Sequence, residues 1–141
     1  MKRMGTYVLV ITLGSDADLE VGALGTLHFP AGIYCYAGSA MGGLDQRVNR
    51  HISRDKKVRW HIDRLTLAAD SVEAFESYPD YVGECTLARM AGECGMEPVF
   101  RGFGCSDCKC PTHLFRADPG SLSRLVDSAG LEPFVDRTQT L

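Results

Sequence analysis

Two runs of apolar and β-branched residues dominate the pattern along the chain. Residues 7–13 are apolar or β-branched throughout and end at a Gly-Ser-Asp turn, and residues 33–39 follow a Pro-Ala-Gly turn. Each run predicts a strand buried in a sheet. Weaker patterns predict one or two short strands within 21–29, a strand at 71–78, and edge strands at 98–102 and 113–117.

Helical spacing of apolar residues appears between these strands. Leu44, Val48 and Ile52 recur at i, i+4 and i+8, which predicts an amphipathic helix over 44–54 with basic residues on its other side. Similar spacing predicts helices at 60–69, 81–94 and 119–129, and a glycine that can serve as a C-cap follows the last two.

These elements predict one α/β domain of the α+β type, with a small mixed or antiparallel sheet of three or more strands flanked by three or four helices. A length of 141 residues and a hydrophobic content of 45% suit one domain with its own core. We expect the core at 5–95, a cysteine turn with edge strands at 96–118, a helix at 119–130 and a loose tail at 131–141.

The chain contains no apolar run near the ~18 residues that a membrane span needs. Its N-terminus also lacks the pattern of a secretory signal, so we expect a cytoplasmic protein with no membrane partner. Cysteines should then be mostly reduced, and Cys35, Cys85 and Cys94 are expected to be small buried hydrophobes.

Positive charge is concentrated in one segment. The net charge is −3, yet residues 45–64 hold seven Lys or Arg against three Asp, a local charge of +4. A basic segment on an acidic protein is typical of a localised phosphate-binding face, and equally of an ordinary solvated helix face.

Two tripeptides and three single residues, in a fixed order, resemble the GIY-YIG nuclease superfamily. Gly5-Thr6-Tyr7 resembles its first tripeptide and Tyr36-Ala37-Gly38 its second, with Ala37 in place of isoleucine. Arg47 and His51, one helical turn apart, resemble its helix pair, and Glu84 resembles its metal-binding glutamate. The whole chain is closer to a branch of small proteins with that domain, through segments GxYxYxGSA at 32–40, WHID at 60–63, ECxLA at 84–88 and GxSDCxCxxHLF at 104–115.

The resemblance implies a catalytic set of Tyr7, Tyr36, Arg47, His51 and Glu84. Glu84 would hold Mg²⁺ or Mn²⁺, since hard cations prefer carboxylate oxygens. Arg47 can fork onto a phosphate, His51 can shuttle a proton, and either tyrosine could position or deprotonate water if cationic neighbours lower its pKa. Taken singly, these residues also fit strand aromatics, a solvated helix face and a carboxylate that complements a helix dipole.

The residues around this set predict contacts with nucleic acid. The expected contacts are Gly38, Ser39, Arg50, Arg54, Lys56, Lys57, Arg59 and His61. The insertion at 14–31 separates the two tripeptides and is expected to add a hairpin beside the active face.

The cysteine turn has residue types that zinc selects. Cys105, Cys108, Cys110 and His113 could bind Zn²⁺, although their spacing is tighter than that of paired zinc knuckles. The alternatives are a turn held by Ser106 and Asp107, a redox-active thiol pair, or a contribution of Asp107 or His113 to the active face.

The resemblance therefore predicts a divalent-metal-dependent endonuclease acting on DNA rather than RNA, selective for structure rather than sequence, with a role in repair or recombination. A partner protein could supply targeting, because one small domain has little surface for reading bases. The alternatives are a nucleic-acid-binding module that cleaves nothing, and a zinc or redox interaction protein organised on the cysteine turn.

Overall fold

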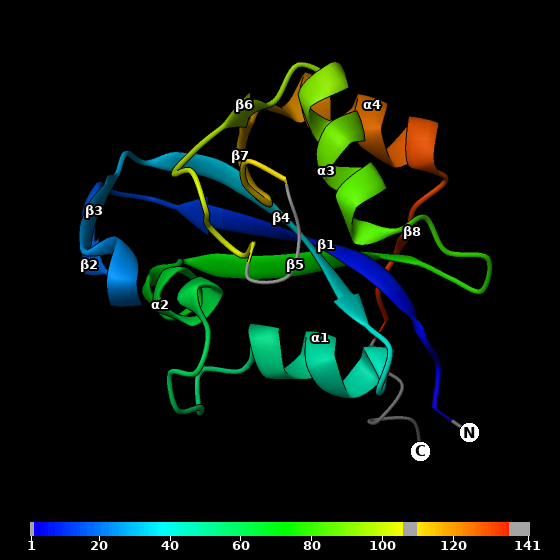
Figure 1. The fold of residues 1–141 in the computed structure, drawn as a ribbon, viewed down its shortest axis with the longest axis horizontal. Coiled ribbons are helices and arrows are strands. Elements are labelled where there is room, and N and C mark those ends of the chain that lie inside the picture. Colours follow the sequence, from blue (N-terminus) through cyan, green and yellow to red (C-terminus); the bar gives the residue numbers. More distant parts are fainter. Residues whose placement is uncertain (1, 106–109, 136–141) are drawn as a thin grey trace.

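Strand β1 (Gly5–Leu13) lies at the centre of a six-stranded sheet. In this computed structural model, which describes residues 2–105 and 110–135, β1 pairs with β4 (Gly32–Ala40) on one side and with β5 (Ser71–Ser77) on the other. The remaining strands are β6 (Glu97–Pro98), β7 (Leu114–Ala117) and β8 (Glu132–Pro133). The order is β6-β7-β4-β1-β5-β8 with every pair antiparallel, which confirms the predicted fold class (Figure 1).

Helices cover both faces of this sheet (Figure 1). They are α1 (Leu44–Ile52), α2 (His61–Ala68), α3 (Glu84–Glu93) and α4 (Pro119–Ala129). Successive side chains of β1 enter different cores: Leu9 and Ile11 pack with α1 and α2, whereas Val8 and Val10 pack with α3 and α4. Because both sides are covered, β1 is apolar at consecutive positions, and the uninterrupted run in the sequence follows from that.

The insertion folds as a separate hairpin, as expected. Its strands are β2 (Ala17–Glu20) and β3 (Thr26–Phe29), joined by the 3₁₀ turn η1 (Gly22–Leu24). The Cβ of a residue replacing Gly22 would lie 3.3 Å from Nε2 of His61, so the turn between the strands lies against the start of α2.

Several predicted boundaries were wrong. The strand expected at 98–102 is limited to Glu97–Pro98. The supposed loose tail begins as β8, which pairs with Phe75 and Glu76 of β5. Cys85, expected to be buried, is exposed. Helix α3 starts only at Glu84 and turns its Leu87, Ala88 and Ala91 stripe to the sheet, and Cys85 lies roughly a third of a turn away from that stripe.

No helix within the described residues is long and apolar enough to span a bilayer.

Candidate active site

The five residues that the resemblance singled out line one cleft of about 510 Å³. They come from four elements: Tyr7 from β1, Tyr36 from β4, Arg47 and His51 from α1, and Glu84 from α3. They lie far apart in the sequence, between positions 7 and 84, so only the tertiary structure brings them together.

Pairing between β1 and β4 places the two tyrosines on the same face of the sheet. Tyr7 is opposite Gly38, and Tyr36 is opposite Leu9, two residues further along β1. A Cβ at Gly38 would overlap the hydroxyl of Tyr7. The glycine in the Tyr36-Ala37-Gly38 motif is therefore needed for the Tyr7 ring to lie across β4.

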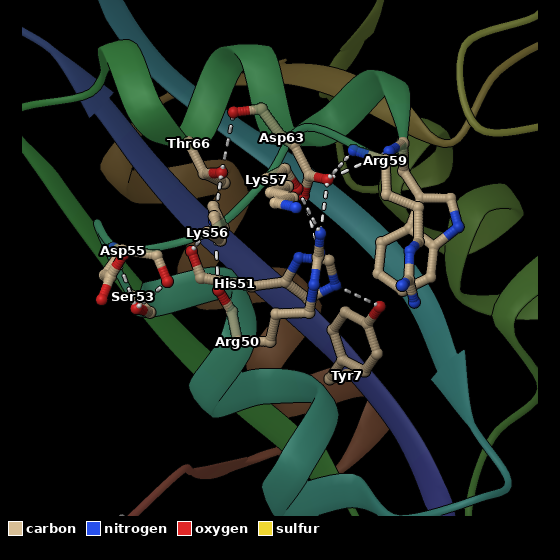
Figure 2. A network of polar contacts seen from close by, with 11 residues as sticks. Tyr7, Arg50, His51, Ser53, Asp55, Lys56, Lys57, Arg59, Asp63 and Thr66 are labelled. Carbon is tan, nitrogen blue, oxygen red and sulfur yellow. Dashed lines mark hydrogen bonds and ion pairs between the residues drawn. The ribbon is translucent and has the colours of Figure 1, made fainter.

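Tyr7 and His51 form a buried polar pair at the base of the cleft. The Tyr7 hydroxyl lies 2.8 Å from Nε2 of His51, and both side chains are almost completely buried (Figure 2). Burial lowers the pKa of His51 to about 3, with a smaller effect in the same direction from Lys56, so the imidazole is neutral at pH 7. Nδ1 of His51 is buried with no hydrogen-bond partner among the described residues.

A tyrosine was expected to act as a base only if cationic neighbours lower its pKa, and the net shift at both tyrosines is in the other direction. Burial raises the pKa of Tyr7 to about 12 and outweighs Arg47, whose charge and hydrogen bond act to lower it. Burial likewise raises the pKa of Tyr36. In the free protein both phenols keep their protons at neutral pH.

Arg47 reaches the cleft from the first half of α1. Its guanidinium donates to the backbone oxygen of Ser39 at 3.1 Å and lies 4.8 Å from the centre of the Trp60 ring. These contacts hold a planar cation beside the Tyr7 hydroxyl, where its fork can meet a phosphate.

Glu84 belongs to the other face of the sheet and reaches the cleft around an edge. Strand β7 stops at Leu114, opposite Tyr36, whereas β4 continues to Ala40. Beyond that point Ser39 of β4 donates from its Oγ to Oε1 of Glu84 at 3.1 Å. Glu84 is the only carboxylate among the cleft-lining residues that the structure describes, and its side chain is 36% exposed. A carboxylate beside a hydroxyl suits Mg²⁺ or Mn²⁺, which retain several water ligands.

Asp63 organises the wall formed by the Trp60-His61-Ile62-Asp63 segment. Its fully buried carboxylate accepts two hydrogen bonds of 2.9 Å from Arg50, and also bonds from the backbone amides of Arg59 and Trp60 (Figure 2). Burial alone would raise the pKa of Asp63, but these bonds lower it to about 2. Asp63 thereby fixes the position of Trp60. The guanidinium of Arg50 lies 4.4 Å from the centre of the Trp60 ring, and that of Arg47 also lies over the ring.

Three of the expected phosphate contacts already bind protein groups. Arg50 binds Asp63, and Lys56 donates to the backbone oxygens of Arg50 and His51 at the end of α1 (Figure 2). Arg54 donates to the backbone oxygens of Leu67 and Ala69. Burial lowers the pKa of Lys56 to about 8. The structure thus gives Arg50, Arg54 and Lys56 a role in joining α1 to α2, and their contact with nucleic acid stays a prediction.

The other expected contacts divide into two groups. Gly38, Ser39, Arg59 and His61 line the cleft. Lys57 is exposed and is not among the lining residues.

A family model described as "Domain of unknown function DUF123" matches residues 6–131. The chain belongs to the DUF123 family. Comparison with curated proteins and with solved structures found no significant match. The matched part of this DUF123 domain runs from β1 to the residue before β8, so it includes every element that contributes to the cleft.

The cysteine turn of the DUF123 domain is arranged differently from the predicted zinc set. Cys110 and His113 lie close to Cys85, which comes from the first turn of α3, and the ligand atoms of these three residues are within 4.8 Å of one another. Cys105 is not in this group; its thiol donates to the backbone oxygen of Phe103, and its side chain lines the cleft. Cys108 lies outside the described residues.

Sequence reasoning missed two contributors to this region. Trp60 was not among the predicted site residues, yet it lines the cleft and carries the contacts with Arg47 and Arg50. Cys85 was assigned to the core. The signal for Cys85 was its position directly after Glu84, since a side chain at the start of the same helix turn can reach the same cleft.

Proposed function

We propose that this protein is a divalent-metal-dependent endonuclease that hydrolyses phosphodiester bonds in DNA. The observation that carries the proposal is the convergence of Tyr7, Tyr36, Arg47, His51 and Glu84 on one cleft. These are the residues that resemble the GIY-YIG set, and they supply the groups that phosphodiester hydrolysis needs: a carboxylate for a cation, a guanidinium for the phosphate, and a polar pair for proton transfer.

Charge in the cleft supports an anionic substrate. Among the described residues that line the cleft there are two arginines, Arg47 and Arg59, and a single carboxylate, and His51 contributes no charge at neutral pH. A Mg²⁺ ion held by Glu84 would supply positive charge next to the non-bridging phosphate oxygens and balance the glutamate. Arg47 would donate to the same phosphate.

Proton transfer is assigned to the Tyr7–His51 pair. The Tyr7 oxygen can take a proton from water while its own proton passes to Nε2 of His51, 2.8 Å away. The negative charge of Glu84 is one of the effects that raise the Tyr7 pKa. Neutralising that charge removes this effect and makes the phenol a better proton relay.

The substrate is proposed to be branched, flapped or otherwise distorted DNA. A cleft of about 510 Å³ in a 141-residue chain offers few side chains for reading base edges. Recognition of backbone shape, or a targeting partner, would then select the cleavage position.

The test is cleavage of labelled linear, flapped, forked and four-way DNA with Mg²⁺ or Mn²⁺. Glu84→Gln keeps the shape of the side chain and removes its charge, so cleavage should fall at least about 100-fold, in line with the loss of one electrostatic group at an active site. Glu93→Gln is the matched control, because Glu93 lies on the same helix at the exposed end and its loss should change nothing.

Arg47→Ala and Arg64→Ala form a second pair. Arg47 lines the cleft, whereas Arg64 belongs to the same basic segment, is exposed and is not among the lining residues. Only Arg47→Ala should impair cleavage. Binding that weakens steeply with salt, without cleavage of any substrate by the wild type, would replace the nuclease with a binding module.

A further inference from the structure

A second group of ligand-type side chains borders the cleft. Cys85 lies in the first turn of α3, Cys110 belongs to the cysteine turn, and His113 directly precedes β7. Their ligand atoms all lie within 4.8 Å of one another, and Sγ of Cys85 is 3.8 Å from Nε2 of His113. Cys85 and His113 are 28 positions apart in the sequence, so tertiary packing and not a local motif brings them together.

These separations fit a tetrahedral zinc ion. Zn–S bonds of about 2.3 Å and Zn–N bonds of about 2.0 Å hold neighbouring ligand atoms roughly 3.5–3.8 Å apart. The distance between Cys85 and His113 already falls at the upper end of that range. The sulfur of Cys110 lies within 4.8 Å of the other two ligand atoms. It therefore needs to move by about 1 Å at most to reach a tetrahedral distance, and rotation of the side chain can provide that shift.

The position of Glu84 favours metal binding by His113. Oε2 of Glu84 lies 3.4 Å from Nδ1 of His113, a close approach and not a formed hydrogen bond, and Nε2 of the same ring faces Cys85. Zinc-bound histidines are commonly oriented in this way, by a carboxylate at the ring nitrogen that does not bind the metal. Cys85 benefits from the start of α3, since the N-terminus of a helix stabilises a thiolate.

We propose that Cys85, Cys110 and His113 bind one Zn²⁺ ion, with Glu84 orienting the His113 ring. Two sulfurs and one imidazole nitrogen form a soft donor set that prefers zinc to magnesium. Water can take the fourth tetrahedral position, as in other sites with three protein ligands. Binding deprotonates both thiols and ties the cysteine turn to the helix that carries Glu84.

The metal content of the full chain tests this proposal without any nuclease assay. Protein purified with a thiol reductant and without chelator should contain one zinc per chain by elemental mass spectrometry. After removal of the metal by chelation, titration with Co²⁺ should produce the visible bands of tetrahedral cobalt and the near-ultraviolet band of cobalt–thiolate bonds, both saturating at one equivalent.

Cysteine variants distinguish this ligand set from the one expected from sequence. Cys85→Ser and Cys110→Ser should lose the stoichiometric metal, whereas Cys105→Ser should retain it. Cys94→Ser is the matched control at the other end of α3. Glu84→Ala should retain zinc with an affinity weaker by roughly 10–100-fold, as for other residues that orient a metal ligand.

Thiol protection tests the same site in the wild type, so a variant that fails to fold cannot obscure the answer. Added Zn²⁺ should protect Cys85 and Cys110 from alkylation by iodoacetamide, as located by peptide mass spectrometry, and leave the modification of Cys94 unchanged. Absence of bound metal and of protection would overturn the proposal, as would full zinc retention by Cys85→Ser. Either result leaves the cleavage test with Arg47→Ala and Arg64→Ala unaffected, because neither arginine takes part in the proposed zinc site and all cysteines stay intact.

Discussion

Acidification should destabilise this protein through His51. The imidazole is 1% exposed, and burial lowers its pKa from 6.5 to about 3. The unfolded chain therefore takes up a proton below pH 6.5, whereas the native chain does not until about pH 3. A group whose native pKa is lowered in this way stabilises the fold least at low pH, so stability falls as the pH drops from 6.5 towards 3.

The size of the effect follows from the pKa difference. Each pH unit within this window costs about 1.4 kcal/mol. The full cost applies only below pH 6.5, where the unfolded chain is protonated at this ring. Between pH 7 and pH 5, His51 alone should therefore remove about 2 kcal/mol from the free energy of unfolding. Burial also lowers the pKa of His113, so the total loss in the wild type should exceed the share of His51.

Chemical denaturation at pH 7 and pH 5 measures this loss. His51→Gln removes the titrating ring and keeps a polar group near Tyr7, so its stability should fall by about 2 kcal/mol less than that of the wild type over this interval. His28→Gln is the control, because His28 lies in the β2–β3 hairpin with a side chain 57% exposed. Equal pH dependence in wild type and His51→Gln would refute the reasoning, and so would an imidazole NMR titration of His51 near pH 6.5.

Two further substitutions test the construction of the cleft. Gly38→Ala should push the Tyr7 ring from its position and cost about 1–3 kcal/mol of stability, as overpacking does. Gly42→Ala should cost little, because its Cβ would meet nothing within 4 Å. Equal melting temperatures for the two variants would contradict the placement of Tyr7. Asp63→Asn should lower the free energy of unfolding, measured with denaturant, by about 2–3 kcal/mol. This is less than for a fully buried ion pair, because the Arg50 side chain is 24% exposed. Substitution of the exposed Asp55 by Asn is the control and should be near neutral, and a neutral Asp63→Asn would show that the pair with Arg50 contributes no net stability.

The architecture was largely accessible from the sequence, because its signals are local. The apolar runs that became β1 and β4 and the spacing of Leu44 and Val48 on α1 each need only a few neighbouring residues to be recognised. The two-residue strand β8 was missed because Glu-Pro carries no strand signal, and only the adjacent edge of β5 makes it a strand.

The site was accessible as a set of residues but not as a set of contacts. Sequence order suggested which side chains belong together. It could not show that Arg54 and Lys56 donate hydrogen bonds to backbone oxygens of α2 and α1. The direction of the Tyr7 pKa shift could not be predicted, because a nearby arginine can be inferred from the sequence, whereas the depth of burial that outweighs it cannot. The proximity of Cys85 to Cys110 could not be predicted either, because a contact between α3 and a distant turn leaves no local pattern in the sequence.

Both borders of the six-stranded sheet consist of the same dipeptide. Glu97–Pro98 forms β6 at one border, and Glu132–Pro133 forms β8 at the other. A strand from a second molecule would meet a proline without an amide hydrogen and a negative charge at either place, so pairing there would leave backbone groups unsatisfied. At the positions that they occupy, these two border strands thus disfavour edge-to-edge pairing of the domain with a second copy.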